Sequence, residues 1–113
     1  MLLKKVEELN PWDLQEKLER GDPILIVDVR EPSEFIGEMG HISGSINIPT
    51  SQIASGFEDM KKNFQGEIVL VCHTGERSYA VCRYLMEQGL EKVSHIRGGI
   101  VQWHLSGLGV EYE

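Results

Sequence analysis

The sequence predicts an α/β protein, with a parallel sheet covered by helices on both faces, and two observations carry this prediction. Residues 24–29 (ILIVDV) and 68–71 (IVLV) are short apolar runs rich in β-branched residues, which suits strands buried on both faces. Segments with the pattern of helices separate these runs from each other and from weaker strand candidates. Strands separated by helices form βαβ units, whose strands lie parallel in one sheet.

The remaining elements follow along the chain. Asn10 and Pro11 are typical of a helix N-terminus and Gly21 of a helix end, so we expect a helix over residues 11–19. Its apolar positions are Trp12, Leu14 and Leu18. Further helices are expected at residues 31–35, 51–64 and 79–89, and weaker strands at residues 5–7, 45–48 and 92–96.

Length and charge restrict the class of protein. The chain has 113 residues, enough to bury a core without disulfides, and we expect a single domain over residues 1–113. A formal net charge of −7 argues against nucleic acid or an anionic membrane as a partner, because both bind basic surfaces. No apolar run is long enough for a signal peptide or a membrane span, so we expect a cytoplasmic protein, and we take it to be a monomer.

The segment that carries most functional information is IVLVCHTGERS, residues 68–78. Cys72 follows a predicted buried strand directly, at the edge where parallel sheets bind ligands. Gly75 lets the chain turn back tightly before a helix that begins near Ser78. Such a turn points backbone N–H groups inward, and with the helix N-terminus they form an anion nest that favours a cysteine thiolate. The pattern predicts a nucleophile beside an anion site, and attack on phosphorus and attack on sulfur both stay open.

The candidate site is this loop. Cys72 is the expected catalytic nucleophile, and the expected substrate-binding groups are His73, Thr74, Gly75, Glu76, Arg77 and Ser78. Arg77 is the candidate for orienting an anionic donor, whereas Glu76 would repel one and suits the first turn of a helix. Arg30 follows the end of another predicted strand and is a candidate for the pocket rim.

These motifs resemble the single-domain rhodaneses, a family of sulfurtransferase modules, over nearly the whole chain. The loop from Cys72 is similar to the family's active-site loop, which starts with a cysteine after the fourth strand. Three other segments match in order: residues 26–35 (IVDVREPSEF), 40–49 (GHISGSINIP) and 97–103 (RGGIVQW). The resemblance implies a five-stranded parallel sheet with helices on both faces, as the pattern of elements does.

The resemblance also implies a reaction. The Cys72 thiolate would take sulfane sulfur from thiosulfate or a persulfide donor, and the resulting persulfide would pass it to cyanide, a thiol or a partner protein, without a metal or an organic cofactor. The related dual-specificity phosphatases have a loop one residue longer, whereas only four residues separate Cys72 from Arg77. Sulfur transfer is therefore favoured. The alternatives are a phosphatase or arsenate reductase that uses Cys72, and a non-catalytic module that binds a partner.

Other residues receive structural interpretations. Cys82 and Trp103 are expected to pack in the core, because single residues of these types on a helix face are usually buried. Asp28 is expected to bond the backbone of the following turn or of the GHISGS segment, and His41 to organise its own loop. The four histidines do not have the spacing of a metal site, so none is expected.

Overall fold

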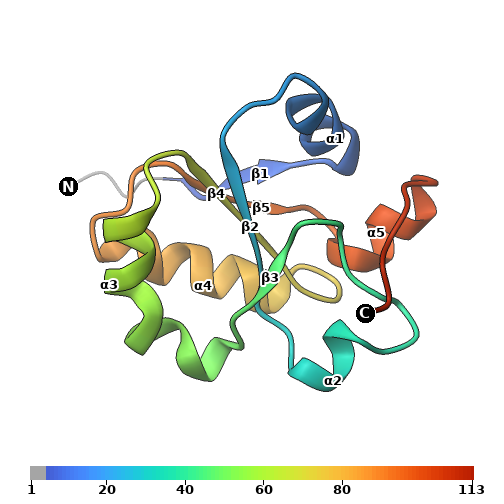
Figure 1. The fold of residues 1–113 in the computed structure, drawn as a ribbon. Coiled ribbons are helices and arrows are strands. Elements are labelled where there is room, and N and C mark those ends of the chain that lie inside the picture. The colour runs from blue at the N-terminus through green and yellow to red at the C-terminus, as the bar shows by residue number, and fades with distance from the viewer. Residues whose placement is uncertain (1–4) are drawn as a thin grey trace.

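The framework of the protein is a five-stranded parallel sheet, seen in a computed structural model that describes residues 5–113 (Figure 1). Its strands are β1 (Glu7–Leu9), β2 (Ile24–Asp28), β3 (Ile46–Asn47), β4 (Glu67–Val71) and β5 (Val93–Ile96). Their order across the sheet is β1-β5-β4-β2-β3, and every pairing is parallel. The predicted fold class is confirmed. The first strand lies two residues beyond the predicted 5–7, because pairing with β5 sets its position.

Helices cover both faces of this sheet. They are α1 (Pro11–Glu19), α2 (Pro32–Phe35), α3 (Ile53–Asn63), α4 (Glu76–Glu87) and α5 (Gly99–Leu105), and the 3-10 turn η1 (Thr50–Gln52) precedes α3. Figure 1 shows α3 and α4 on one face, and α1 and α5 on the other. Within residues 5–113, no helix is long and apolar enough to cross a membrane.

The central strand β4 is buried on both of its faces over residues 68–71, so the side chains there must be apolar. Successive side chains of a strand point to opposite faces. Ile68, Leu70 and Cys72 therefore join the core under α3 and α4, whereas Val69 and Val71 join the core under α1 and α5. Both β2 and β5 pair with β4, so the polar residues that follow these strands meet at the same edge of the sheet.

The amino end of α1 has the predicted cap. The side chain of Asn10 accepts a hydrogen bond from the backbone N–H of Asp13 at 2.9 Å, and the Asp13 carboxylate accepts one from the backbone N–H of Asn10 at 3.2 Å. Of the apolar positions predicted for this helix, Leu14 is fully buried but Trp12 is 58% exposed. Two residues of helix rotate a side chain by roughly 200°, so Trp12 and Leu14 point to nearly opposite sides.

Helix α4 begins at Glu76, two residues before the predicted start near Ser78. Gly75 has φ +115°, a conformation that favours glycine, and its carbonyl accepts the first helical hydrogen bond, from the N–H of Tyr79 at 3.0 Å. The turn after β4 is therefore confined to residues 72–75. Arg77 and Ser78 belong to the helix, which fixes the directions of their side chains.

Candidate active site

The Cys72 thiol lies where the β4 strand meets the amino end of α4. Its side chain is fully buried, and Sγ accepts hydrogen bonds from the backbone N–H of Gly75 at 3.1 Å and of Ser78 at 3.3 Å. The sequence predicted that backbone N–H groups of this turn point inward, and these two donate to the sulfur. Two converging N–H groups stabilise negative charge on Sγ, as a thiolate requires.

The amino end of α5 forms backbone hydrogen bonds to this loop. The backbone N–H of Ile100 donates to the Cys72 carbonyl at 2.8 Å, and that of Val101 donates to the His73 carbonyl at 3.1 Å. Gly99 has φ +62°, and a Cβ there would lie 2.4 Å from the His73 carbonyl oxygen. The two glycines of RGGIVQW therefore allow α5 to pack directly against the loop that carries Cys72.

Behind the sulfur, polar side chains continue into the core. Ser78 Oγ lies 3.4 Å from Cys72 Sγ and 2.9 Å from Nδ1 of His95. Nε2 of His95 lies 3.0 Å from Oε2 of Glu8. His95 is 2% exposed, and this burial lowers its pKa. The sequence suggested no role for His95 except that of a metal ligand, which was not expected; its place in a predicted strand was the only signal available.

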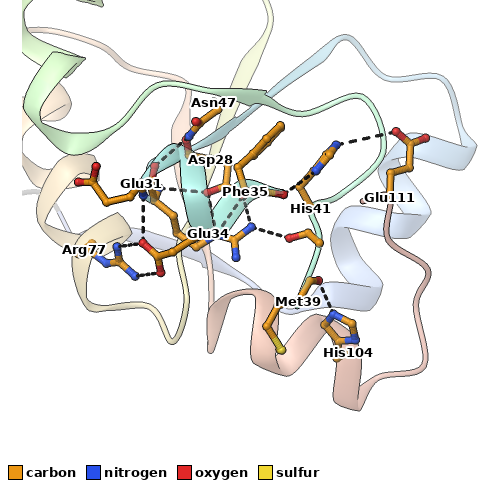
Figure 2. A network of polar contacts seen from close by, with 12 residues as sticks. Asp28, Glu31, Glu34, Phe35, Met39, His41, Asn47, Arg77, His104 and Glu111 are labelled. Atoms are coloured by element: carbon orange, nitrogen blue, oxygen red, sulfur yellow. Dashed lines mark hydrogen bonds and ion pairs between the residues drawn. The ribbon is translucent and has the colours of Figure 1, made fainter. Parts of the chain in front are cut away.

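Arg77 makes a two-point ion pair with Glu34 of α2, as Figure 2 shows. Its two terminal nitrogens lie 2.7 and 3.0 Å from the two carboxylate oxygens. This hydrogen bonding holds the pKa of Glu34 at about 2 and raises the pKa of Arg77. The guanidinium that was expected to orient an anionic donor is thus already paired. Glu34 was noticed only as part of IVDVREPSEF, and its role as the partner of Arg77 was missed.

The other loop residues face outward. His73, Thr74 and Glu76 are exposed, whereas Gly75 is buried under the turn. The Thr74 hydroxyl donates a short hydrogen bond to the Glu76 carboxylate, which lowers the pKa of Glu76. Glu76 is the first residue of α4, the place predicted for it. A carboxylate at this position is stabilised by the positive end of the helix dipole. It accepts its hydrogen bond from the loop residue Thr74, not from Cys72.

Arg30 does not lie at the pocket rim, and that expectation is wrong. Its side chain is 1% exposed, and its guanidinium contacts both carboxylate oxygens of Asp28, with the shortest distance at 2.7 Å. It also donates to the carbonyl of Gly40 at 2.7 Å. A buried carboxylate needs a cation beside it, so Arg30 is drawn inward. Asp28 itself accepts from the backbone N–H of Arg30 at 3.1 Å, which confirms its predicted bond to the following turn.

The residues given structural interpretations behave as expected. His41 stacks on Phe35 with ring centroids 3.8 Å apart and lies 2.9 Å from its carbonyl oxygen, so it organises its loop (Figure 2). Trp103 is buried and donates to the carbonyl of Gly109 at 2.9 Å. Cys82 is fully buried, and burial raises the pKa of its thiol to about 12. Among the described residues 5–113, no three His, Cys, Asp or Glu side chains cluster as metal ligands.

Comparisons with known proteins agree with this geometry. Residues 10–106 match the family model described as the rhodanese-like domain. The chain is 33% identical over 105 residues to a protein named sulfurtransferase from Allochromatium vinosum, which covers 93% of this chain and 94% of the relative. The fold superposes on a rhodanese-related protein from Thermoplasma volcanium with a TM-score of 0.82 and 32% identity, covering 95% of this chain and 99% of the other.

A second solved structure bears on the alternative chemistry. A Rhodopseudomonas palustris protein of unknown function, described as a possible tyrosine phosphatase, superposes with a TM-score of 0.83 and 25% identity over 94% of this chain and 85% of the other. The fold, the cysteine loop and the family match together place the chain in a defined class of protein. It belongs to the rhodanese-like family, as its motifs suggested.

Proposed function

We propose that this chain is a sulfurtransferase that carries sulfane sulfur as a persulfide on Cys72. The observation that supports this best is the environment of the Cys72 sulfur. The backbone N–H groups of Gly75 and Ser78 both donate hydrogen bonds to Sγ, within a six-residue loop. Such donors stabilise a thiolate, the charge that develops during transfer and a terminal persulfide anion. The relative named sulfurtransferase is consistent with this chemistry.

The transfer takes two steps. The Cys72 thiolate attacks the outer sulfur of thiosulfate or of a persulfide, a new S–S bond forms, and the donor's S–S bond breaks with its electron pair leaving on sulfite or on a thiolate. An acceptor then attacks the outer sulfur of the Cys72 persulfide, whose S–S bond breaks and restores the thiolate. The proposed acceptors are cyanide in an assay, and a thiol or a partner protein in the cell.

The ion pair at Arg77 bears on the choice of donor. Because Glu34 cancels its charge, Arg77 offers a thiosulfate dianion less attraction than a free guanidinium would. We therefore expect a persulfide to be a better donor than thiosulfate. Glu34→Gln should lower the KM for thiosulfate by roughly fivefold, the effect of about 1 kcal/mol at a partly exposed charge. The exposed Glu38→Gln is the matched control and should leave KM unchanged.

A phosphatase that uses the same cysteine is the second candidate, favoured by the likeness to the Rhodopseudomonas protein. One experiment separates the two. The protein is incubated with thiosulfate, its intact mass is measured, and cyanide is then added while thiocyanate is assayed. We expect the mass to increase by one sulfur atom, and cyanide to remove this atom. The Cys72→Ser variant should not gain the sulfur atom, whereas the Cys82→Ser variant should. Hydrolysis of p-nitrophenyl phosphate without any sulfur adduct would overturn the proposal.

A further inference from the structure

A path of polar side chains leads from the Cys72 sulfur to the surface. Cys72 Sγ lies 3.4 Å from Ser78 Oγ, and this oxygen lies 2.9 Å from His95 Nδ1. Across the imidazole ring, Nε2 lies 3.0 Å from Oε2 of Glu8. The four side chains come from the end of β4, from α4, from β5 and from β1. The two-step transfer proposed above uses neither His95 nor Glu8.

The directions of these hydrogen bonds are consistent along the path. The Cys72 thiol can donate to Ser78 Oγ, whose single proton then has two acceptors within reach. These are Nδ1 of His95 at 2.9 Å and the carbonyl oxygen of Gly75 at 3.3 Å, and the shorter distance favours His95. The backbone N–H groups of Gly75 and Ser78 already point at the sulfur. When the thiol proton leaves, two donors are in place to stabilise the thiolate.

Burying the side chain of His95 at this position disfavours the folded state. It is 2% exposed, and within residues 5–113 its Nε2 has no well-aligned hydrogen bond, although Glu8 lies near. A buried polar atom without such a bond destabilises the folded protein. An amide side chain could bond the Ser78 hydroxyl equally well. What imidazole adds is a basic nitrogen that can accept a proton near neutral pH.

We propose that Ser78, His95 and Glu8 form a proton relay that deprotonates Cys72, and this inference rests on the proposed function because it serves the same nucleophile. The S–H bond of Cys72 breaks, its proton passes to Ser78 Oγ, and the original hydroxyl proton of Ser78 moves to Nδ1 of His95. The hydroxyl is regenerated, and the products are a thiolate and an imidazolium. Glu8 stabilises the imidazolium and, being 37% exposed at its side chain, opens the path to solvent.

The charges around His95 suit this role. Burial lowers the pKa of the imidazole, which favours its neutral form with a lone pair available, and the carboxylate of Glu8 opposes the shift. Glu8 is held between His95 and Arg97, whose guanidinium lies 3.5 Å from the other carboxylate oxygen. Tyr79 of α4 meets the imidazole edge-on with centroids 5.8 Å apart. The titratable and charged groups that line the open depression of about 430 Å³ beside His95 are Glu8, Glu76, Tyr79 and Arg97.

Alkylation of Cys72 by iodoacetamide tests the relay without any sulfur donor. Ser78→Ala removes the hydroxyl but keeps the backbone N–H, and His95→Asn keeps a hydrogen-bonding atom near Nδ1 but cannot take a proton. The matched control is His104→Asn, since His104 bonds the Met39 carbonyl away from the site. Rates are measured by intact mass from about pH 6 to about pH 10, and peptide mapping assigns the adduct.

We expect both relay variants to react at least about tenfold more slowly than the parent at pH 7, because a positioned base commonly contributes about 10²–10⁴-fold. Their rates should rejoin that of the parent near pH 10, where hydroxide removes the thiol proton directly. Glu8→Gln, at the surface, should give a smaller loss with the same recovery, and His104→Asn should match the parent throughout. Recovery at high pH is the signature that a merely structural role would not produce.

Two results would overturn the relay: unchanged rates at pH 7 in both variants, or a loss of equal size at every pH. The sulfur adduct formed with thiosulfate is measured separately. An adduct without the alkylation pattern would remove the relay and leave the proposed function standing. The alkylation pattern without an adduct would remove the proposed function and leave the relay standing.

Discussion

Replacing Gly99 by alanine tests how the loop that carries Cys72 is held in place. A Cβ at Gly99 would lie 2.4 Å from the carbonyl oxygen of His73 and 2.5 Å from that of Cys72. Both atoms belong to the backbone, so neither can rotate away. Helix α5 must move by several tenths of an ångström or more, which weakens the hydrogen bonds that Ile100 and Val101 donate to those carbonyls at 2.8 and 3.1 Å.

The magnitude follows from two contributions. A left-handed conformation costs alanine about 1 kcal/mol, and overpacking against fixed atoms costs about 1–3 kcal/mol. We expect Gly99→Ala to lower the free energy of unfolding by about 3 kcal/mol. Gly107→Ala is the matched control, because Gly107 follows the other end of α5 with φ +78° and has no atom within 4 Å of the added Cβ. It should lose only about 1 kcal/mol, the conformational part.

The assay is urea unfolding followed by circular dichroism, together with the rate of Cys72 alkylation in the folded protein. Gly99→Ala should also change the alkylation rate, since the shifted loop moves the N–H groups of Gly75 and Ser78 relative to the sulfur. Gly107→Ala should leave that rate unchanged. Equal losses of stability in the two variants would refute the reasoning, because the contact with the loop would then contribute nothing beyond backbone strain.

Three further predictions concern the ion pairs and the second cysteine. The folded pKa of Glu34 lies at about 2, below its ordinary 4.5, so its pair with Arg77 stabilises the protein above pH 4.5 and loses this effect as the pH falls towards 2. With side chains 33% and 39% exposed, we expect about 1 kcal/mol, and Glu34→Gln should flatten this part of the pH dependence of urea unfolding. Arg30→Met should cost about 3–5 kcal/mol in the same assay, because it leaves the carboxylate of Asp28 buried without a cation; a loss under 1 kcal/mol would contradict this. Cys82, whose thiol pKa is about 12, should stay unlabelled by iodoacetamide at about pH 8 until the protein unfolds, and labelling of folded protein seen by peptide mapping would count against its burial.

Local patterns were sufficient where a residue acts on its own neighbours. Asn10 caps the helix predicted for it, and Gly75 turns the chain after β4, because both effects depend on atoms within a few residues. The apolar run of β4 indicated a strand buried on both faces, and Cys72 was placed correctly at its end. The exposure of Trp12 does not follow from its local pattern, because it depends on which face of α1 meets the sheet.

The amino-acid sequence alone determined the class of fold, the order of its elements and the position of Cys72 at the end of a strand. Only the tertiary structure decided what surrounds Cys72, because its partners come from distant parts of the chain. Glu34 meets Arg77 across 43 residues and His95 meets Ser78 across 17, through a parallel sheet that gathers strand ends at one edge. Pairing over such distances depends on register and helix rotation, which short motifs do not specify. Arg77 is therefore paired with Glu34, and His95 lies next to Ser78, which contacts the Cys72 sulfur.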